Sequence, residues 1–500
     1  MRMPVPIGAG GQFQPAVRRV RAAALLAAIV CCELAAGVMV VDPRFGKLLL
    51  LGLAVLGLVL VFRAPFAAAL GILVLVAAVL EPGTYAFAVG PLDLRLEELL
   101  LGSLLLVALV RPRRDWWGGE AGAALGMFLA VIALSAVAAI SAGRVDFSDA
   151  FNLSRPLAFL ALFYVVVRLF PEPERLHGLL TAAVVVAAAG GVAAVLFALP
   201  GSPLANVLPE QHQVGAGLSE GAGSIRRVRL PGVLLGFPLF WYVTSRWAGA
   251  ASNRRLLWAC AAAALLAAIA LSFNRNMWAG LVVGLALMLA FGAHSRRRQF
   301  AGVLLAIAAT GILLLLSPAK VSEQSALKPV AERGRTLLQP GKTAQENSLD
   351  DRRDENRIAM AAIERHPVLG VGPGAPFGRR GLEAVGPGLS PRRSEQLWVH
   401  NQYLHILLMG GIVALLPFLA FLGFLTRAVV RGRRSDDQLL ALGVGLGTLM
   451  LSALVMIYVV NPTSALTLGL LGGSVSVLAS AQMAPARSGL NSGRHEAGTA

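Results

Sequence analysis

Long apolar runs alternate with short polar stretches along almost the whole chain. Runs of roughly 17 to 25 residues are long enough to cross about 30 Å of hydrocarbon as helices. This length criterion predicts an all-α polytopic membrane protein with about 12 to 14 transmembrane helices, the lower number applying if the shortest runs do not cross. The runs lie near residues 20–41, 46–62, 66–81, 96–110, 121–141, 154–170, 176–199, 231–248, 255–271, 277–293, 299–317, 398–426, 438–460 and 463–481.

The composition agrees with a protein that resides in lipid. The chain has 500 residues, of which 56% are hydrophobic and only 14% charged, and its mean hydropathy is +0.70. These values exclude a soluble multidomain protein. The formal net charge of +17 would suit a nucleic-acid partner, but the basic residues form short clusters between apolar runs, as cytoplasmic anchors do. We therefore expect a lipid bilayer, and no nucleic acid, as the surroundings of the chain.

The three cysteines carry no metal or redox signal. Cys31, Cys32 and Cys260 all fall inside apolar runs, so they form neither a disulfide framework nor a zinc-ligand spacing. The sequence predicts no metal site and no cofactor.

The distribution of arginines predicts the orientation of the spans, because short loops rich in Lys and Arg stay in the cytoplasm. With the N-terminus inside, every strong basic cluster but the one at 224–229 falls in an inner loop. The outer side also receives a short turn with Arg275 and one large hydrophilic loop, which translocates regardless of its charge. The predicted organisation is an inner N-terminal tail at 1–19, transmembrane helices over 20–317, the outer loop at 318–397, further transmembrane helices over 398–482 and a disordered inner tail at 483–500.

Within the large loop, residues 348–365 have the pattern of a helix. Ser348, with Asp351 three residues later, is a capping signal, and Pro367 forces an end. Glycine and proline dominate 370–388, which predicts structural turns. A phosphate-binding loop is excluded there because neither Lys-Ser nor Lys-Thr follows the glycines.

Several short motifs surround this loop. An arginine leads the predicted helix, a Pro-x-x-Gly-x-Gly turn follows it, and a His-Asn pair opens the next span ahead of a leucine and two glycines. A Ser-x-x-Arg turn joins two earlier spans, and one more arginine precedes them. Together these motifs resemble the O-antigen ligase and polymerase family of bacterial envelope glycan assembly, over about residues 225–425. The matching positions are Arg357, Pro367–Gly372, His400, Asn401, Leu404, Gly410, Gly411, Ser272–Arg275 and, loosely, Arg229.

The resemblance implies a metal-independent membrane glycosyltransferase of GT-C-like architecture that uses an undecaprenyl-pyrophosphate-linked glycan donor. It implies a multi-pass protein of the bacterial cytoplasmic (inner) membrane, whose large loop is periplasmic and catalytic. The acceptor would be a glycan, lipid A-core or a protein, because the family contains polymerases, ligases of lipopolysaccharide assembly and protein O-glycosyltransferases. The sequence does not separate these three.

The arginines in these motifs suit a pyrophosphate leaving group, which needs fixed cations at the membrane surface. Arginine offers a planar multidentate fork that stays charged at any relevant pH. Arg275 and Arg357 are the predicted pyrophosphate ligands, with Arg229 or Arg365 in support. Asn401 is a further substrate-binding candidate.

The histidine of the His-Asn pair suits the other half of the reaction. A sugar hydroxyl is a poor nucleophile until its proton is removed, and histidine titrates near the working pH. We therefore predict His400 as the general base. One direct displacement by the activated hydroxyl would invert the anomeric configuration.

Each of these residues also has a plainer interpretation. An interfacial histidine is more often a polar anchor than a base, and Arg275 would snorkel to the headgroups from a helix end. Arg365 would complement the C-terminus of the loop helix. His405 lies about 140° around a helix from His400, so the two do not share one ligand site.

Two rival functions remain open at this point. A polysaccharide or lipid transporter or flippase also has many spans, but transporters place polar residues at mid-membrane, often in two related halves. Here the polar residues collect at one face, which favours surface chemistry. A scaffold for envelope assembly is the other rival, and it predicts that no single loop residue matters.

Overall fold

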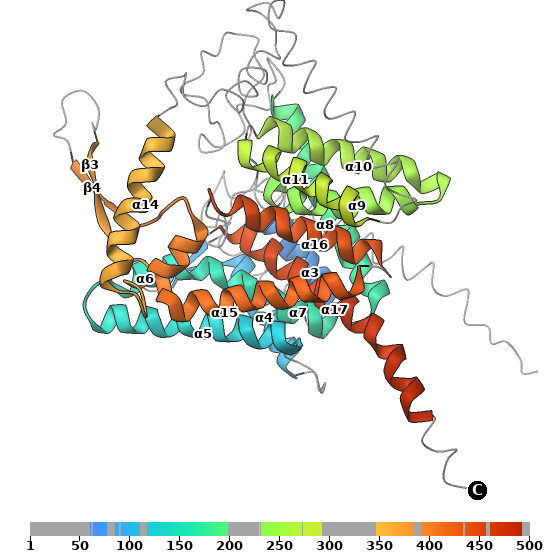
Figure 1. The fold of residues 1–500 in the computed structure, drawn as a ribbon, viewed down its shortest axis with the longest axis horizontal. Helices are drawn as coiled ribbons and strands as arrows, with labels where there is room; N and C mark the ends of the chain where they lie inside the picture. Colours follow the sequence, from blue (N-terminus) through green and yellow to red (C-terminus); the bar gives the residue numbers. More distant parts are fainter. Residues whose placement is uncertain are drawn as a thin grey trace, which may run out of the picture.

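The computed structural model describes residues 61, 64–77, 86–89, 92–110, 118–198, 230, 232–272, 274–292, 347–383, 392–433, 436–456 and 461–492. Over these residues it is nearly all helical (Figure 1). The helices are α3 (Pro65–Ala77), α4 (Leu96–Val110), α5 (Gly119–Ser141), α6 (Phe147–Ser154), the 3-10 helix η1 (Arg155–Ala161), α7 (Leu162–Leu169), α8 (Pro173–Ala198), α9 (Gly232–Gly249), α10 (Ser252–Leu271), α11 (Arg275–Phe291), α14 (Asn347–Arg365), α15 (Gln402–Gly432), α16 (Asp437–Ser452) and α17 (Pro462–Ser492). The strands are β1 (Ala86–Val89), β2 (Leu92–Arg95), β3 (Gly378–Glu383) and β4 (Arg392–Gln396).

Within the described part of the chain, 6 helical segments are long and apolar enough to cross a membrane, judged by length and composition. α6, η1 and α7 together form one of them, while α3, α11 and α16 are shorter apolar helices. α10 leaves Leu256 and Leu257 72% and 71% exposed, as expected of a helix that faces lipid. The prediction of an all-α polytopic membrane protein is confirmed. The spans predicted near 20–41, 46–62 and 299–317 lie outside the described residues, Val61 excepted, so the total count stays a prediction.

The long helices pack closely through small residues. A side chain on Gly284 of α11 would collide with Trp241 of α9 and Thr448 of α16, and one on Gly445 would collide with the backbone of Pro238. Such glycines let helices approach in lipid, where dispersion contacts rather than exclusion of water drive association. α5 and α15 lie side by side along the lower part of the bundle in Figure 1.

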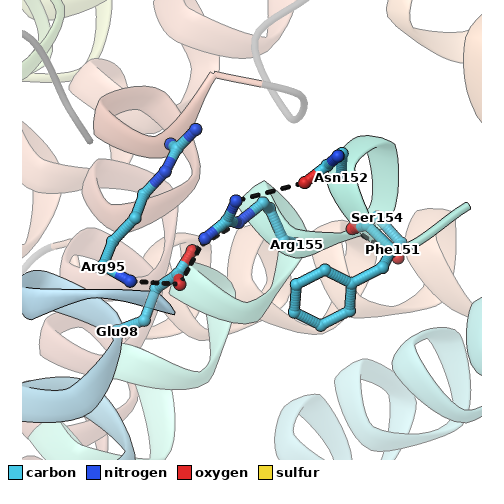
Figure 2. Close-up of polar contacts among 6 residues, drawn as sticks. All are labelled: Arg95, Glu98, Phe151, Asn152, Ser154 and Arg155. Atoms are coloured by element: carbon cyan, nitrogen blue, oxygen red, sulfur yellow. Dashed lines mark hydrogen bonds and ion pairs between the residues drawn. The ribbon is translucent and has the colours of Figure 1, made fainter. Parts of the chain in front are cut away.

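A largely buried ion pair joins the broken span α6–η1–α7 to α4. The Arg155 guanidinium donates from Nε to Oε1 of Glu98 at 2.7 Å and from Nη2 to Oε2 at 2.6 Å. Its Nη1 donates to Asn152, and the backbone N–H of Arg95 donates to the same Glu98 carboxylate (Figure 2). The side chains of Arg155 and Glu98 are only 5% and 16% exposed. The pair thus fixes the point where the helix changes from α to 3-10 geometry, just before Pro156.

The turn after α14 interlocks with a break in α15. Gly411 has φ 63° and ψ −163°, which interrupts the helix. The Ile412 N–H therefore donates to the Pro367 carbonyl at 2.9 Å, and the freed Leu408 carbonyl accepts from the Val371 N–H at 2.8 Å. The glycines of the turn, Gly370, Gly372 and Gly374, have φ of 68°, 104° and 78°. The interpretation of this glycine-rich segment as a structural turn is confirmed, and its partner is the Gly-Gly pair forty residues further on.

The rest of the large loop combines a helix with a hairpin. The predicted helix at 348–365 is confirmed as α14, but β3 and β4 form an antiparallel hairpin where only turns were expected. Figure 1 shows α14 and the hairpin at one edge of the molecule, beside the bundle. A second hairpin, β1–β2, precedes α4. α17 continues to Ser492, whereas the sequence predicted a disordered tail from 483.

Candidate functional site

The first residues of α11 and the start of α15 meet at the C-terminal end of α16. The Ser452 hydroxyl donates to the carbonyl of Asn276, in the first turn of α11, at 3.2 Å. The backbone N–H of Gln402, the first residue of α15, donates to the Ala453 carbonyl at 3.0 Å. Arg275 opens α11 and His400 immediately precedes α15, so both predicted residues lie at the same end of the bundle.

The Ser-x-x-Arg turn is a double helix-capping device. The Ser272 hydroxyl donates to the Ile269 carbonyl at 2.7 Å and accepts from the Asn274 N–H at 3.2 Å. The Asn274 side chain then accepts from the Asn276 N–H at 3.1 Å as the N-cap of α11. These contacts satisfy backbone groups that a helix end leaves free. They also fix the position of Arg275, the half-buried first residue of α11.

His400 forms a close polar pair with Glu355 of α14. The distance from His400 Nδ1 to Glu355 Oε2 is 2.7 Å, and the backbone N–H of His400 also points to that oxygen at 3.4 Å. The glutamate side chain is 2% exposed, whereas the histidine side chain is 41% exposed. A carboxylate can only accept hydrogen bonds, so in the neutral imidazole the proton facing Glu355 is on Nδ1 and the lone pair is on Nε2. The Glu355 carboxylate is therefore buried, whereas the His400 ring is accessible.

Glu355 is buried because it shares a face of α14 with the residues that pack the helix onto the start of α15. Ala359 and Ala362 follow it at helical spacing, both almost fully buried. Val399, next to His400, is fully buried in the same small core. This core consists of Ala359, Ala362, Ile363, Val371, Ala375, Phe377, Val399 and Leu408.

Arg352 brings a second cation to the site. It lies three residues before Glu355, hence about 60° away on the same side of α14, and it is half-buried. Burial and, to a smaller extent, the charge of Arg352 lower the pKa of the Arg275 guanidinium, which relates the loop helix to the start of α11. Two like charges within electrostatic range repel one another. An anion between them would relieve this repulsion.

Arg357 and Arg365 lie away from this face. Arg357 follows Glu355 by two residues, about 200° around the helix, and its Nη2 pairs with Asp354 at 3.1 Å with side-chain exposures of 79% and 66%. Arg365 is exposed in the last turn and donates from Nε to the Ala361 carbonyl at 3.0 Å. Among the described residues neither arginine has a recorded contact with His400. The position of Arg365 agrees with its interpretation as a cation at a helix C-terminus.

The other predicted site residues have structural surroundings. Asn401 is the N-cap of α15, and its side-chain oxygen accepts from the N–H groups of Tyr403 and Leu404 at 3.0 and 3.2 Å. His405 is 1% exposed, inside the bundle and apart from the open side of His400. Arg229 lies outside the described residues.

Sequence reasoning missed Glu355 and Arg352. The signal was present, because a glutamate four residues before Ala359 and seven before Ala362 falls on the apolar face of the predicted helix. A carboxylate in that position needs a buried partner. The arginine one turn earlier shares that face, whereas the arginine chosen from the motif does not.

The fold and this site define a polytopic, all-α membrane protein whose loop helix brings a carboxylate and an arginine to the end of the bundle that holds a histidine and a second arginine. Residues 260–419 match the family model described as O-Antigen ligase. This match supports an assignment of the region to the O-antigen ligase and polymerase family, and with it glycan transfer of that general type. The matched stretch includes α11, α14 and the first half of α15, hence every described residue of the site. A comparison with curated proteins finds no significant match.

Proposed function

We propose that the protein transfers a glycan from an undecaprenyl-pyrophosphate-linked donor to an acceptor hydroxyl at the periplasmic face of the bacterial inner membrane. The observation that carries this proposal is the His400–Glu355 pair at 2.7 Å, with one ring nitrogen left for substrate. The match to the O-antigen ligase model supports a glycan as the transferred group, and the arginines beside the pair support a diphosphate leaving group.

The reaction is a single displacement. His400 Nε2 takes the proton of the acceptor hydroxyl while that oxygen attacks the anomeric carbon of the donor sugar. The bond between the anomeric carbon and the pyrophosphate oxygen breaks, and the lipid pyrophosphate leaves with the electron pair. Configuration at the anomeric carbon inverts. The imidazolium that forms is stabilised by the Glu355 carboxylate, which also fixes the ring in the required tautomer.

Arg275 and Arg352 bind the pyrophosphate in this proposal. Both side chains are half-buried, so a ligand with two negative phosphates offsets the repulsion between the two charges and also gains charge-assisted hydrogen bonds. Arg357, the ligand predicted from the motif, is a weaker candidate for pyrophosphate binding than Arg352. Its side chain lies on the opposite side of α14 and pairs with Asp354.

Substitution of the histidine tests the base assignment. His400→Gln removes the base but keeps an amide that donates to Glu355, so the buried carboxylate retains a partner. Transfer by the purified protein from a lipid-linked donor should fall by about 10²- to 10⁴-fold, the usual contribution of a general base. His366→Ala is the matched control, because His366 is exposed in the same loop, and it should keep its activity. Native activity in His400→Gln would exclude His400 as the base.

A further inference from the structure

A cavity of about 330 Å³ lies at the end of α15 remote from His400. Its walls are the start of α5, the last turns of α15 and the part of α17 around Ser480. The sequence places this end of the helices at the cytoplasmic face, where clustered arginines satisfy the positive-inside tendency. That tendency explains the charges but not a cavity between three helices.

Among the described residues that line the cavity, the charges sum to a single positive charge. Arg427 and Arg431, one helical turn apart, both line it, and Glu120 faces them from α5. Arg427 and Glu120 approach to 3.5 Å, and both are largely exposed. One arginine is thereby offset, and the other retains its charge. The N-terminus of α5, which opens at Gly119 in the same wall, adds the positive end of a helix dipole.

The rest of the α15 wall is apolar, whereas α17 adds the polar residues Ser476, Ser480 and Gln482. Phe424, Leu425 and Ala428 of α15 continue the cavity along the helix toward the middle of the span. A ligand that fits both parts has an anionic head at the arginines and an apolar chain along the helix. Basic pockets between transmembrane helices at the cytoplasmic face recognise lipid headgroups of this kind.

We propose that this cavity binds the phosphodiester headgroup of an anionic phospholipid. The net charge of the site favours a lipid with one uncompensated negative charge over a zwitterionic lipid, whose ammonium group Arg431 would repel. The site is separate from the glycan-transfer site and does not depend on the proposed function.

Native mass spectrometry of the full chain in detergent tests this proposal, with dioleoylphosphatidylglycerol and dioleoylphosphatidylcholine as probes. We expect selective phosphatidylglycerol adducts, which Arg431→Gln weakens by about tenfold through loss of a charge-assisted hydrogen bond. Arg175→Gln is the control for loss of one charge, because Arg175 is an exposed arginine paired with a glutamate at 3.6 Å outside the cavity. It should leave the adducts unchanged, as should His400→Gln.

Three outcomes would overturn the proposal. Equal binding of the two lipids would show that charge does not select the ligand. Native phosphatidylglycerol binding by Arg431→Gln, with an unchanged melting temperature in phosphatidylcholine, would exclude the arginine cavity. The third outcome is that inorganic phosphate alone displaces the phosphatidylglycerol adducts, and does so equally well from Arg175→Gln and Arg431→Gln. The cavity would then show no preference for a lipid headgroup.

Discussion

The molecule contains two carboxylate pairs of similar closeness but opposite character. Glu98 and Arg155 form a double hydrogen bond with side chains only 16% and 5% exposed. Glu355 is buried more deeply, but its partner His400 is 41% exposed and, within the part of the chain that the structure describes, engages one ring nitrogen. A pair whose polar atoms are all satisfied inside the protein fixes the fold. A pair with one free, accessible nitrogen can act on a substrate.

The largest effect should come from breaking the closed pair. Arg155→Met leaves the Glu98 carboxylate without its cation inside the bundle, which should cost about 3–5 kcal/mol of stability. Thermal unfolding in detergent measures the loss. The double variant Glu98→Leu/Arg155→Met should recover most of it, because no charge is then left buried. A stable Arg155→Met protein that has lost transfer activity would instead place this pair in the glycan-transfer site.

The second effect concerns the cations beside the open pair. Arg352→Ala should raise the KM for the lipid-linked donor by about 10- to 100-fold, since a hydrogen bond to a charged group contributes about 1.5–3 kcal/mol. Arg357→Ala is the matched variant on the other side of α14, and loss of its exposed pair with Asp354 should change little. The reverse ranking of the two variants would restore Arg357 as the pyrophosphate ligand.

The smallest effect distinguishes a helix cap from a substrate contact next to the open pair. Asn401→Ala should cost about 1 kcal/mol of stability, while Asn401→Ser should cost much less because serine also caps helices well. Both should keep the native KM for the donor. A stable Asn401→Ser protein with weakened donor binding would favour the substrate-binding role predicted from the His-Asn motif.

The sequence predicted the helices well because apolar runs of membrane length carry a strong and local signal. It did not predict the two breaks in long spans, at Gly411 and near Pro156, since each depends on a distant partner. The break at Gly411 is stabilised by the turn at Pro367, and the one near Pro156 by the Arg155–Glu98 pair. Local patterns do not report such pairings.

The candidate site was predicted in part for the same reason. His400 and Arg275 stood out by motif and position, and the structure places both at one end of the bundle. Glu355 and Arg352 were hidden within a charged stretch of the loop helix, where only the side of the helix distinguishes them from Arg357. That side is decided by packing against Val399 and Leu408, which lie far along the chain.

A double-mutant cycle tests most directly whether Glu355 acts through His400. The kcat for glycan transfer is measured for the native protein, Glu355→Gln, His400→Gln and the double variant, each with an unchanged melting temperature. We predict that Glu355→Gln lowers kcat on the order of tenfold in the native background and has no further effect when His400 is already replaced, as residues acting as one unit do. The same loss of kcat in both backgrounds would mean that the two residues act independently, and the account of the open pair would be wrong.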